Sequence, residues 1–160
     1  LDNTKYCCTL GRMTCLKFSE EIDLVVSALT RASASIGAVG KSGKAAQQMG
    51  GYAYRGIDDV VNAVSPALIE QQLVIVPFDL ETKTEPWAEK WHKVNIRMLF
   101  TIVHSSGQWI STEMVGQALD NGDKGLGKAR SYCLRELLTR MFLIPTNDDT
   151  EATNYSGGKR

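Results

Sequence analysis

Asp120–Asp149 reads DNGDKGLGKARSYCLRELLTRMFLIPTNDD, and this stretch decides the fold more than any other part of the chain. A glycine-rich turn opens into a segment with helical periodicity, which predicts a helix from about Lys124 to Phe142. At 100° per residue, polar side chains fall along one side of this helix and apolar side chains along the other. The polar stripe contains Lys124, Lys128, Ser131, Tyr132, Arg135 and Thr139. The opposite face contains Leu134, Leu137, Leu138 and Met141.

The polar stripe suits a phosphate backbone, because the N–H groups of a glycine turn and a helix N-terminus favour anions. A solvated helix face would show the same pattern, so the periodicity leaves both interpretations open. Arg130 does not fit this pattern, since it falls on the apolar side near the start of the helix. We expect it to pair with Asp120 or Asp123, or to reach DNA or a neighbouring subunit.

Two shorter helices are expected upstream of this stretch. The first begins at Ser19, which is a good N-cap, with Glu20 and Glu21 in its first turn. Its expected core face contains Ile22, Val25, Val26, Leu29 and Ile36. The second is marked by Ile57, Val60, Val61, Val64 and Leu68. We expect it to be kinked or restarted at Pro66, where Ser65 could cap a new turn.

Three strands are expected between the second helix and the long one. Period-two alternation places them at Leu73–Lys83, His92–Val103 and Trp109–Gly116. In the middle strand one face contains Val94, Ile96, Met98, Phe100 and Ile102. Ser105–Gly107 suits a hairpin turn. The predicted fold class is therefore α+β, with helices followed by a three-stranded antiparallel β-meander that the long helix covers.

Length and composition favour one domain. The chain has 160 residues, of which 43% are hydrophobic, enough for a single core. We expect residues 1–18 to form an N-terminal arm or an added remnant, 19–150 to form the domain, and 151–160 to be a flexible tail. No stretch approaches the roughly 20 apolar residues of a membrane span, and the start lacks the order of a signal peptide. We therefore expect a cytoplasmic protein with no membrane partner.

The charge balance is unusual for a nucleic-acid binder. The formal net charge is zero, whereas such domains usually have a basic excess. The distribution is uneven, however, because four basic and no acidic residues lie from Arg31 to Arg55. Four cysteines and two histidines show no metal-ligand spacing, so no metal is expected. Asp58 and Asp59 are expected to cap and charge the second helix.

Two patterns resemble enzyme motifs only in part. Gly122–Lys128 has the spacing of a Walker A loop, but Ala129 follows it where magnesium coordination requires Ser or Thr. Asp79, Glu81 and Lys83 alternate onto one strand face and faintly resemble a nuclease metal motif, but they are so close together that a polar strand end is the better explanation. We expect no enzymatic activity and no cofactor. A phosphate-binding NTPase and a structural homo-oligomer without DNA binding are kept as alternatives.

A glycine-rich loop carries Lys41 and Lys44 and leads to Tyr52, Tyr54 and Arg55. Aromatic rings can stack on bases while Arg and Lys hold phosphates, but tyrosines beside a glycine turn can equally be partial core residues. A second basic and aromatic group accompanies the middle strand and contains Lys83, Trp87, Lys90, Trp91, His92, Lys93 and Arg97. It predicts either a second nucleic-acid surface or an exposed hairpin tip with its tryptophans buried against the core or a partner.

The motifs GDKGLGKARSY, FLIPTNDD and YRGIDDVV, over roughly Ser19–Asp149, resemble the ERF (essential recombination function) family of phage and bacterial single-strand annealing proteins. The resemblance implies the fold of the eukaryotic strand-annealing recombination mediators. It also implies ATP-independent annealing of single-stranded DNA in recombination and repair, by homo-oligomeric rings or helical filaments. Single-strand binding protein or other recombination proteins would be further partners. The candidate DNA-binding residues are Lys41, Lys44, Tyr52, Tyr54, Arg55, Lys93, Arg97, Lys124, Lys128, Arg130 and Arg135.

Overall fold

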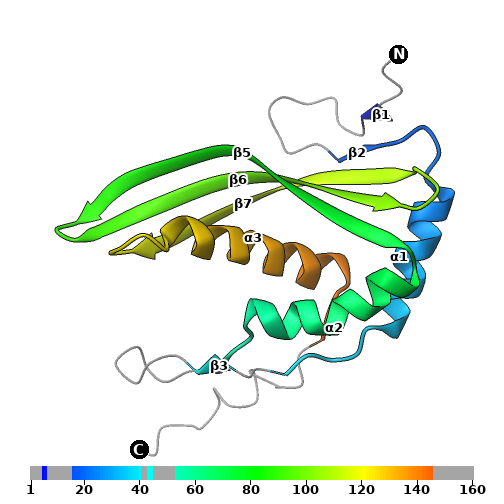
Figure 1. The fold of residues 1–160 in the computed structure, drawn as a ribbon, viewed down its shortest axis with the longest axis horizontal. Helices are drawn as coiled ribbons and strands as arrows, with labels where there is room; N and C mark the ends of the chain where they lie inside the picture. The colour runs from blue at the N-terminus through cyan, green and yellow to red at the C-terminus, as the bar shows by residue number, and fades with distance from the viewer. Residues whose placement is uncertain (1–4, 7–15, 41–42, 45–52, 146–160) are drawn as a thin grey trace, which may run out of the picture.

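A computed structural model describes residues 5–6, 16–40, 43–44 and 53–145 of the protein. One face of its main sheet is covered by helices (Figure 1). The long elements are α1 (Asp23–Ser35), α2 (Ile57–Glu70), β5 (Leu73–Ala88), β6 (Trp91–His104), β7 (Trp109–Asp120) and α3 (Gly125–Met141). The short strands are β1 (Lys5–Tyr6), β2 (Lys17–Phe18), β3 (Gly43–Lys44) and β4 (Ala53–Tyr54). This arrangement confirms the predicted α+β class and the long helix after the strands.

The main sheet is larger than the predicted meander. Its strand order is β1-β2-β7-β6-β5, with every neighbouring pair antiparallel, while β3 and β4 form a separate pair. The meander β5-β6-β7 is confirmed, but β2 adds to its edge where Lys17 pairs with Ser111. The long strands also run past their predicted ends, because pairing continues through polar residues as far as Ala88 and Trp91.

The core between sheet and helix follows the predicted alternation of the middle strand. Its buried side chains are Val94, Ile96, Met98, Phe100 and Ile102, as predicted. The first four pack against α3, which lies between the sheet and α2 (Figure 1). Ile102 belongs to the cluster formed by α1, α2 and the end of α3. A Cβ atom at Gly116 would lie 2.5 Å from the Cys133 Sγ, so β7 and α3 approach closely only because this residue is glycine.

The start of α1 differs from the prediction. Ser19 is not its N-cap, because the Ser19 N–H donates to the Trp109 carbonyl at 3.0 Å and the Trp109 N–H donates to the Ser19 Oγ at 3.0 Å. The free N–H groups of Leu24 and Val25 instead donate to Gln108 Oε1, at 2.8 and 3.1 Å. A residue of the β6–β7 connection therefore caps this helix, which no local pattern indicates.

Two further details of the helices differ from the prediction. Val26, placed on the core face of α1, is 42% exposed. The second helix does not restart at Pro66, since α2 runs through that residue and no new turn is capped by Ser65. None of the described helices is long and apolar enough to cross a membrane.

A β-bulge changes the faces of β5. The register shifts between Asp79, which pairs with Met98, and Glu81, which pairs with Arg97. Because Met98 faces the helices and Arg97 faces the uncovered side, the carboxylates of Asp79 and Glu81 point to opposite faces. The expectation that Asp79, Glu81 and Lys83 share one strand face is therefore wrong, and their resemblance to a nuclease motif disappears.

Candidate nucleic-acid interface

An open groove of about 670 Å³ follows the polar stripe of α3. Its walls are the start of α2, at Gly56 and Ile57, and the end of β7, at Gln117 and Ala118. Most of the predicted stripe lines it, namely Lys124, Lys128, Ser131, Tyr132 and Arg135. Helical periodicity therefore predicted the floor of the groove, whereas its walls come from segments far away in the sequence.

Local hydrogen bonds set the two ends of this groove. At the start of α2, the Gly56 N–H donates to Asp59 Oδ2 at 2.9 Å, which confirms that an aspartate caps this helix. After β7, the Gly122 N–H donates to Asp120 Oδ1 at 2.7 Å and turns the chain toward α3. The Lys124 backbone N–H also donates to the Asp120 carboxylate. The first turn of α3 lies beside the groove, which Lys124 and Gly127 line, and the N–H groups of such a turn favour an anion.

Lys128 is held in the groove by an ion pair with Asp120. The Asp120 side chain is only 6% exposed, so this carboxylate is a buried anchor for Lys128, whereas the acidic residue that lines the groove is Asp123. The hydrogen bond from Lys128, followed by that from the Gly122 N–H, holds the pKa of Asp120 below its ordinary value. An ammonium group has three donors, so Lys128 keeps further donors for a phosphate at the half-exposed surface.

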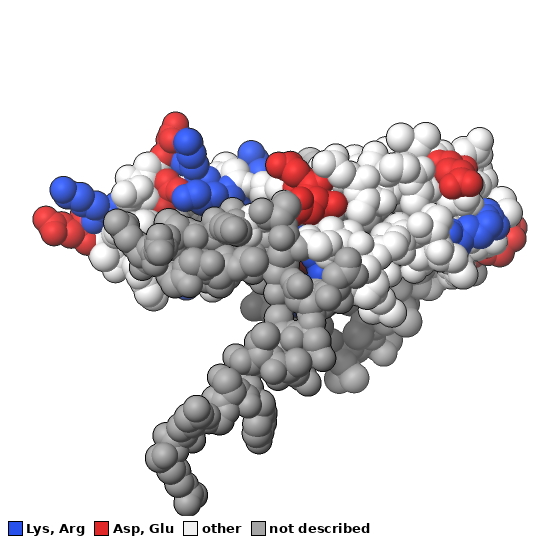
Figure 2. Space-filling view, turned by 90° about the horizontal axis from the view of Figure 1, so that it is seen from below, with Lys and Arg blue, Asp and Glu red and all other residues white. Residues whose placement is uncertain are grey.

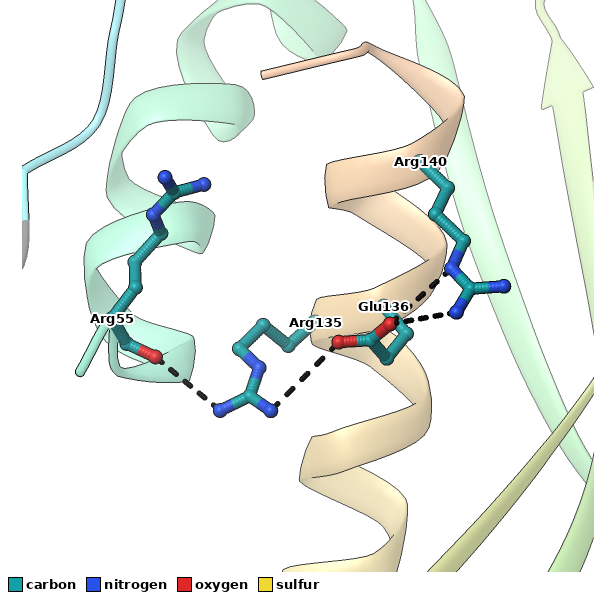
Figure 3. A network of polar contacts seen from close by, with 4 residues as sticks. All are labelled: Arg55, Arg135, Glu136 and Arg140. Atoms are coloured by element: carbon teal, nitrogen blue, oxygen red, sulfur yellow. Dashed lines mark hydrogen bonds and ion pairs between the residues drawn. The ribbon is translucent and has the colours of Figure 1, made fainter. Parts of the chain in front are cut away.

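Arg135 lies in a small polar network (Figure 3). Its Nη1 donates to the Arg55 carbonyl at 3.3 Å, and its Nη2 lies 3.8 Å from Glu136 Oε1. Glu136 also pairs with Arg140, at 3.2 Å, so its charge is shared between two guanidinium groups. The Arg135 guanidinium lies 5.4 Å from the centre of the Tyr132 ring. These contacts fix Arg135 without neutralising it fully.

Lys124 is the least engaged cation of the groove, because it pairs with no acidic side chain in the described parts of the chain. Figure 2 shows exposed Lys and Arg side chains gathered toward the end of the molecule where α3 begins, with acidic side chains among them. Zero net charge thus coexists with a local concentration of positive charge.

Arg130 and Arg97 lie away from the groove. Arg130 pairs with Asp79 on β5, with Nε at 3.0 Å, so the predicted pairing with Asp120 or Asp123 is wrong. Its hydrogen bond to Asp79 raises the pKa of the Arg130 guanidinium. Arg97 lies on the uncovered sheet face, 3.7 Å from carboxylate oxygens of Glu81 and Glu113.

The other candidate residues are not brought together at the groove. Arg55 offers its carbonyl to Arg135, while its guanidinium points away (Figure 3), and its Nε and Nη2 are buried without a hydrogen-bond partner in the described structure. Lys93 lies over the ring of Trp87 on the β5–β6 hairpin. Lys41 and Tyr52 lie outside the described residues, and Lys44 and Tyr54 are described only as backbone of β3 and β4.

Sequence reasoning missed the acidic partners in this region. Asp120 and Lys128 are eight residues apart, and Asp79 and Arg130 are 51 residues apart. Helical periodicity shows which residues share a face of α3, but not which strand residue packs against that face. The position of Asp120 directly before the glycine turn was the one local sign that it would face the helix start.

An open groove lined by cationic side chains at a helix N-terminus is a feature of proteins that bind nucleic-acid backbones. The sequence pattern of the ERF superfamily matches residues 25–159, and the chain belongs to this superfamily. Membership points to single-strand annealing and recombination. A comparison with curated proteins finds no match.

Proposed function

We propose that this protein binds single-stranded DNA along the α3 groove and anneals complementary strands in homologous recombination. The observation that carries the proposal is that one open groove collects Lys124 and Lys128 at the N-terminus of α3 and Arg135 further along the helix. These groups contact phosphates, which lowers the repulsion between two strands and leaves the base edges free to pair.

The proposed mechanism is arrangement of the strands, with no enzymatic step and no nucleotide cofactor. The turn with Walker A spacing follows β7, which is antiparallel to β6, whereas a nucleotide loop belongs to a parallel βαβ unit. Its lysine, Lys128, is also paired with Asp120. Both observations favour an anion surface over a nucleotide site.

A homo-oligomeric ring or helical filament is part of the proposal, since one short groove covers few nucleotides and annealing needs many in register. The strand order makes β5 an edge of the described sheet, and its uncovered face exposes Val74, Val76 and Phe78. Such an edge and apolar face favour association with another copy. Light scattering tests this, and a monomer at micromolar concentration, with and without DNA, would contradict it. Single-strand binding protein or other recombination proteins complete the proposed partners.

The direct test is fluorescence anisotropy with a labelled single-stranded oligonucleotide, without nucleotide and over a range of salt. We expect binding with little sequence preference and an affinity that falls as salt rises. Two complementary labelled strands then report annealing by energy transfer, with and without ATP. Absent or salt-independent binding would contradict the proposal. Annealing that requires ATP would favour the NTPase, and assembly without DNA binding would favour the structural oligomer.

A further inference from the structure

The β5–β6 hairpin ends in a tip that carries two exposed tryptophans, Trp87 and Trp91. The strands pair as far as Ala88 and Trp91, and Figure 1 shows this end of the sheet projecting past the start of α3. A register shift between Pro86 and Ala88 takes Trp87 out of the regular pairing. The tip therefore stands away from the helices that build the core.

Both indole rings are accessible. Trp87 is 61% exposed and Trp91 is 39% exposed, so the alternative that buries them against the core of the same chain is wrong. The Lys93 Nζ lies 5.4 Å from the centre of the Trp87 ring, a cation–π distance that supports the indole on one side. Two neighbouring exposed tryptophans on a projecting hairpin mark a binding surface, because burying such rings is strongly favourable.

The charges on the hairpin indicate which part of a nucleic acid this surface would contact. From Glu81 to its strand partner Arg97, the hairpin carries four cations and three carboxylates, namely Lys83, Lys90, Lys93, Arg97, Glu81, Glu85 and Glu89. Arg97 lies between Glu81 and Glu113, so the outer hairpin is close to balanced. Lys83 and Glu81 pair with each other at 3.0 Å, and Lys93 is engaged with Trp87. A balanced surface has little net attraction for phosphates, whereas a flat aromatic ring stacks on any nucleobase. The tip thus fits bases better than backbone.

The tip and the groove meet at the edge formed by the end of β7, on opposite faces of the sheet. Gln117 lines the groove and pairs with Asn95 of β6, and two residues further Leu119 pairs with Lys93. Because alternate residues of a strand point to one face, Gln117, Leu119 and Lys93 share a face with the Trp87 ring that Lys93 contacts. This is the uncovered face of the sheet, because Gln117 and Lys93 alternate with Ala118 and Val94, which face α3. A strand that leaves the groove at Gln117 therefore passes around the edge of β7, which in the described chain pairs with β2 only at Ile110 and Ser111, and then crosses Leu119 to the tip.

We infer that Trp87 and Trp91 stack on unpaired bases of the DNA strand whose phosphates lie in the α3 groove. This inference rests on the proposed function and adds a division of roles to it. The groove supplies salt-dependent phosphate contacts, and the tip supplies contacts that depend on the presence of bases. Stacking keeps neighbouring bases separate and unpaired, ready for a complementary strand.

The test uses the full chain and two oligonucleotides of equal phosphate number, one of thymidylate and one abasic. The wild-type protein should bind thymidylate more tightly than the abasic strand, by about 5- to 150-fold for each stacked base. The double variant Trp87→Ala with Trp91→Ala should lose this preference. Its slope of log affinity against log salt should stay the same, because the phosphate contacts in the groove remain.

Two control variants separate stacking from damage to the fold. Trp87→Phe with Trp91→Phe should keep most of the preference for bases, since phenylalanine also stacks. Trp109→Phe, at the opposite end of β7, should leave the preference unchanged. In the Phe double variant only Trp109 still fluoresces, so quenching of tryptophan emission by thymidylate should fall although binding persists.

Three results would overturn the inference, and each can be distinguished from a loss of DNA binding in the groove. Equal wild-type affinity for both oligonucleotides would leave phosphate binding in place and remove the stacking role. An Ala double variant that keeps its preference for bases would do the same. If the Ala double variant also forms a smaller assembly in light scattering while its base preference is unchanged, the tip contacts another copy of the chain. If the wild-type protein binds neither strand, the proposed function itself is wrong.

Discussion

Removing the charge of Lys124 tests the groove with the least disturbance of the fold. Lys124 is the N-cap residue of α3, yet its side chain makes no capping hydrogen bond, and it pairs with no acidic side chain in the described structure. Lys124→Ala should therefore change the free energy of unfolding by no more than about 0.5 kcal/mol. By contrast, Lys128→Ala would leave the buried Asp120 carboxylate without its cation.

The expected effect on binding follows from the number of groove cations. Each phosphate contact on a single strand contributes about −0.7 to the slope of log affinity against log salt. If Lys124, Lys128 and Arg135 each hold one phosphate, the groove contributes about −2.1, and Lys124→Ala reduces this to about −1.4. Over a tenfold rise in salt, affinity should fall about 130-fold for the wild type and about 25-fold for the variant.

Anisotropy titrations of a labelled single strand at several salt concentrations measure both slopes. The matched control is Arg130→Gln, which removes a cation from the same helix that pairs with Asp79 outside the groove. Its slope should equal that of the wild type. If Lys124→Ala keeps the wild-type slope, or Arg130→Gln reduces it equally, the DNA follows another face of α3 and the assignment of the groove is refuted.

Other predictions concern the fold around the groove. Leu137→Ala, at a position only 4% exposed, should lower the free energy of unfolding in denaturant titrations by about 2–5 kcal/mol and reduce DNA binding only through the folded fraction. Gly116→Val should lower the free energy of unfolding by about 1–3 kcal/mol in the same titrations, because any Cβ there meets the Cys133 Sγ. Combining it with Cys133→Ala should restore part of this free energy. Lys128 lowers the pKa of Asp120, so this carboxylate stabilises the fold above its ordinary pKa of 3.8, and the contribution is lost as pH falls through the lower folded value. Circular dichroism should therefore show a steeper loss of wild-type stability below pH 3.8 than for Asp120→Asn.

The elements with strong periodicity could be predicted from the sequence. The alternation from Val94 to Ile102 gave the buried face of β6, and the spacing of Leu137 and Leu138 gave the buried side of α3. The polar stripe of that helix likewise predicted which of its residues would line a groove. These features depend on the repeat of one helix or strand, which is a local property of the chain.

The ends of helices and the register of strands are hard to predict from the sequence where contact with a distant residue determines them. Ser19 looks like an N-cap, but the strand contact with Trp109 uses its hydroxyl, and Gln108 caps α1 instead. The bulge after Asp79 is similarly invisible in the alternation of β5, because it depends on how that strand pairs with β6. At the start of α1 and in β5, pairing with a residue far away in the sequence overrides the local preference of the chain.

By itself, the sequence determined the order of helices and strands, the two faces of α3 and the ERF motifs, because each is written in neighbouring residues. Only the tertiary structure decided which charges pair, with Lys128 on Asp120 and Arg130 on Asp79. It also decided that Trp87 projects from the molecule instead of packing into the core. The physical reason is that an ion pair or an exposed ring depends on which surfaces meet when the sheet packs on the helices. That meeting joins residues from distant parts of the chain, and no local repeat encodes it.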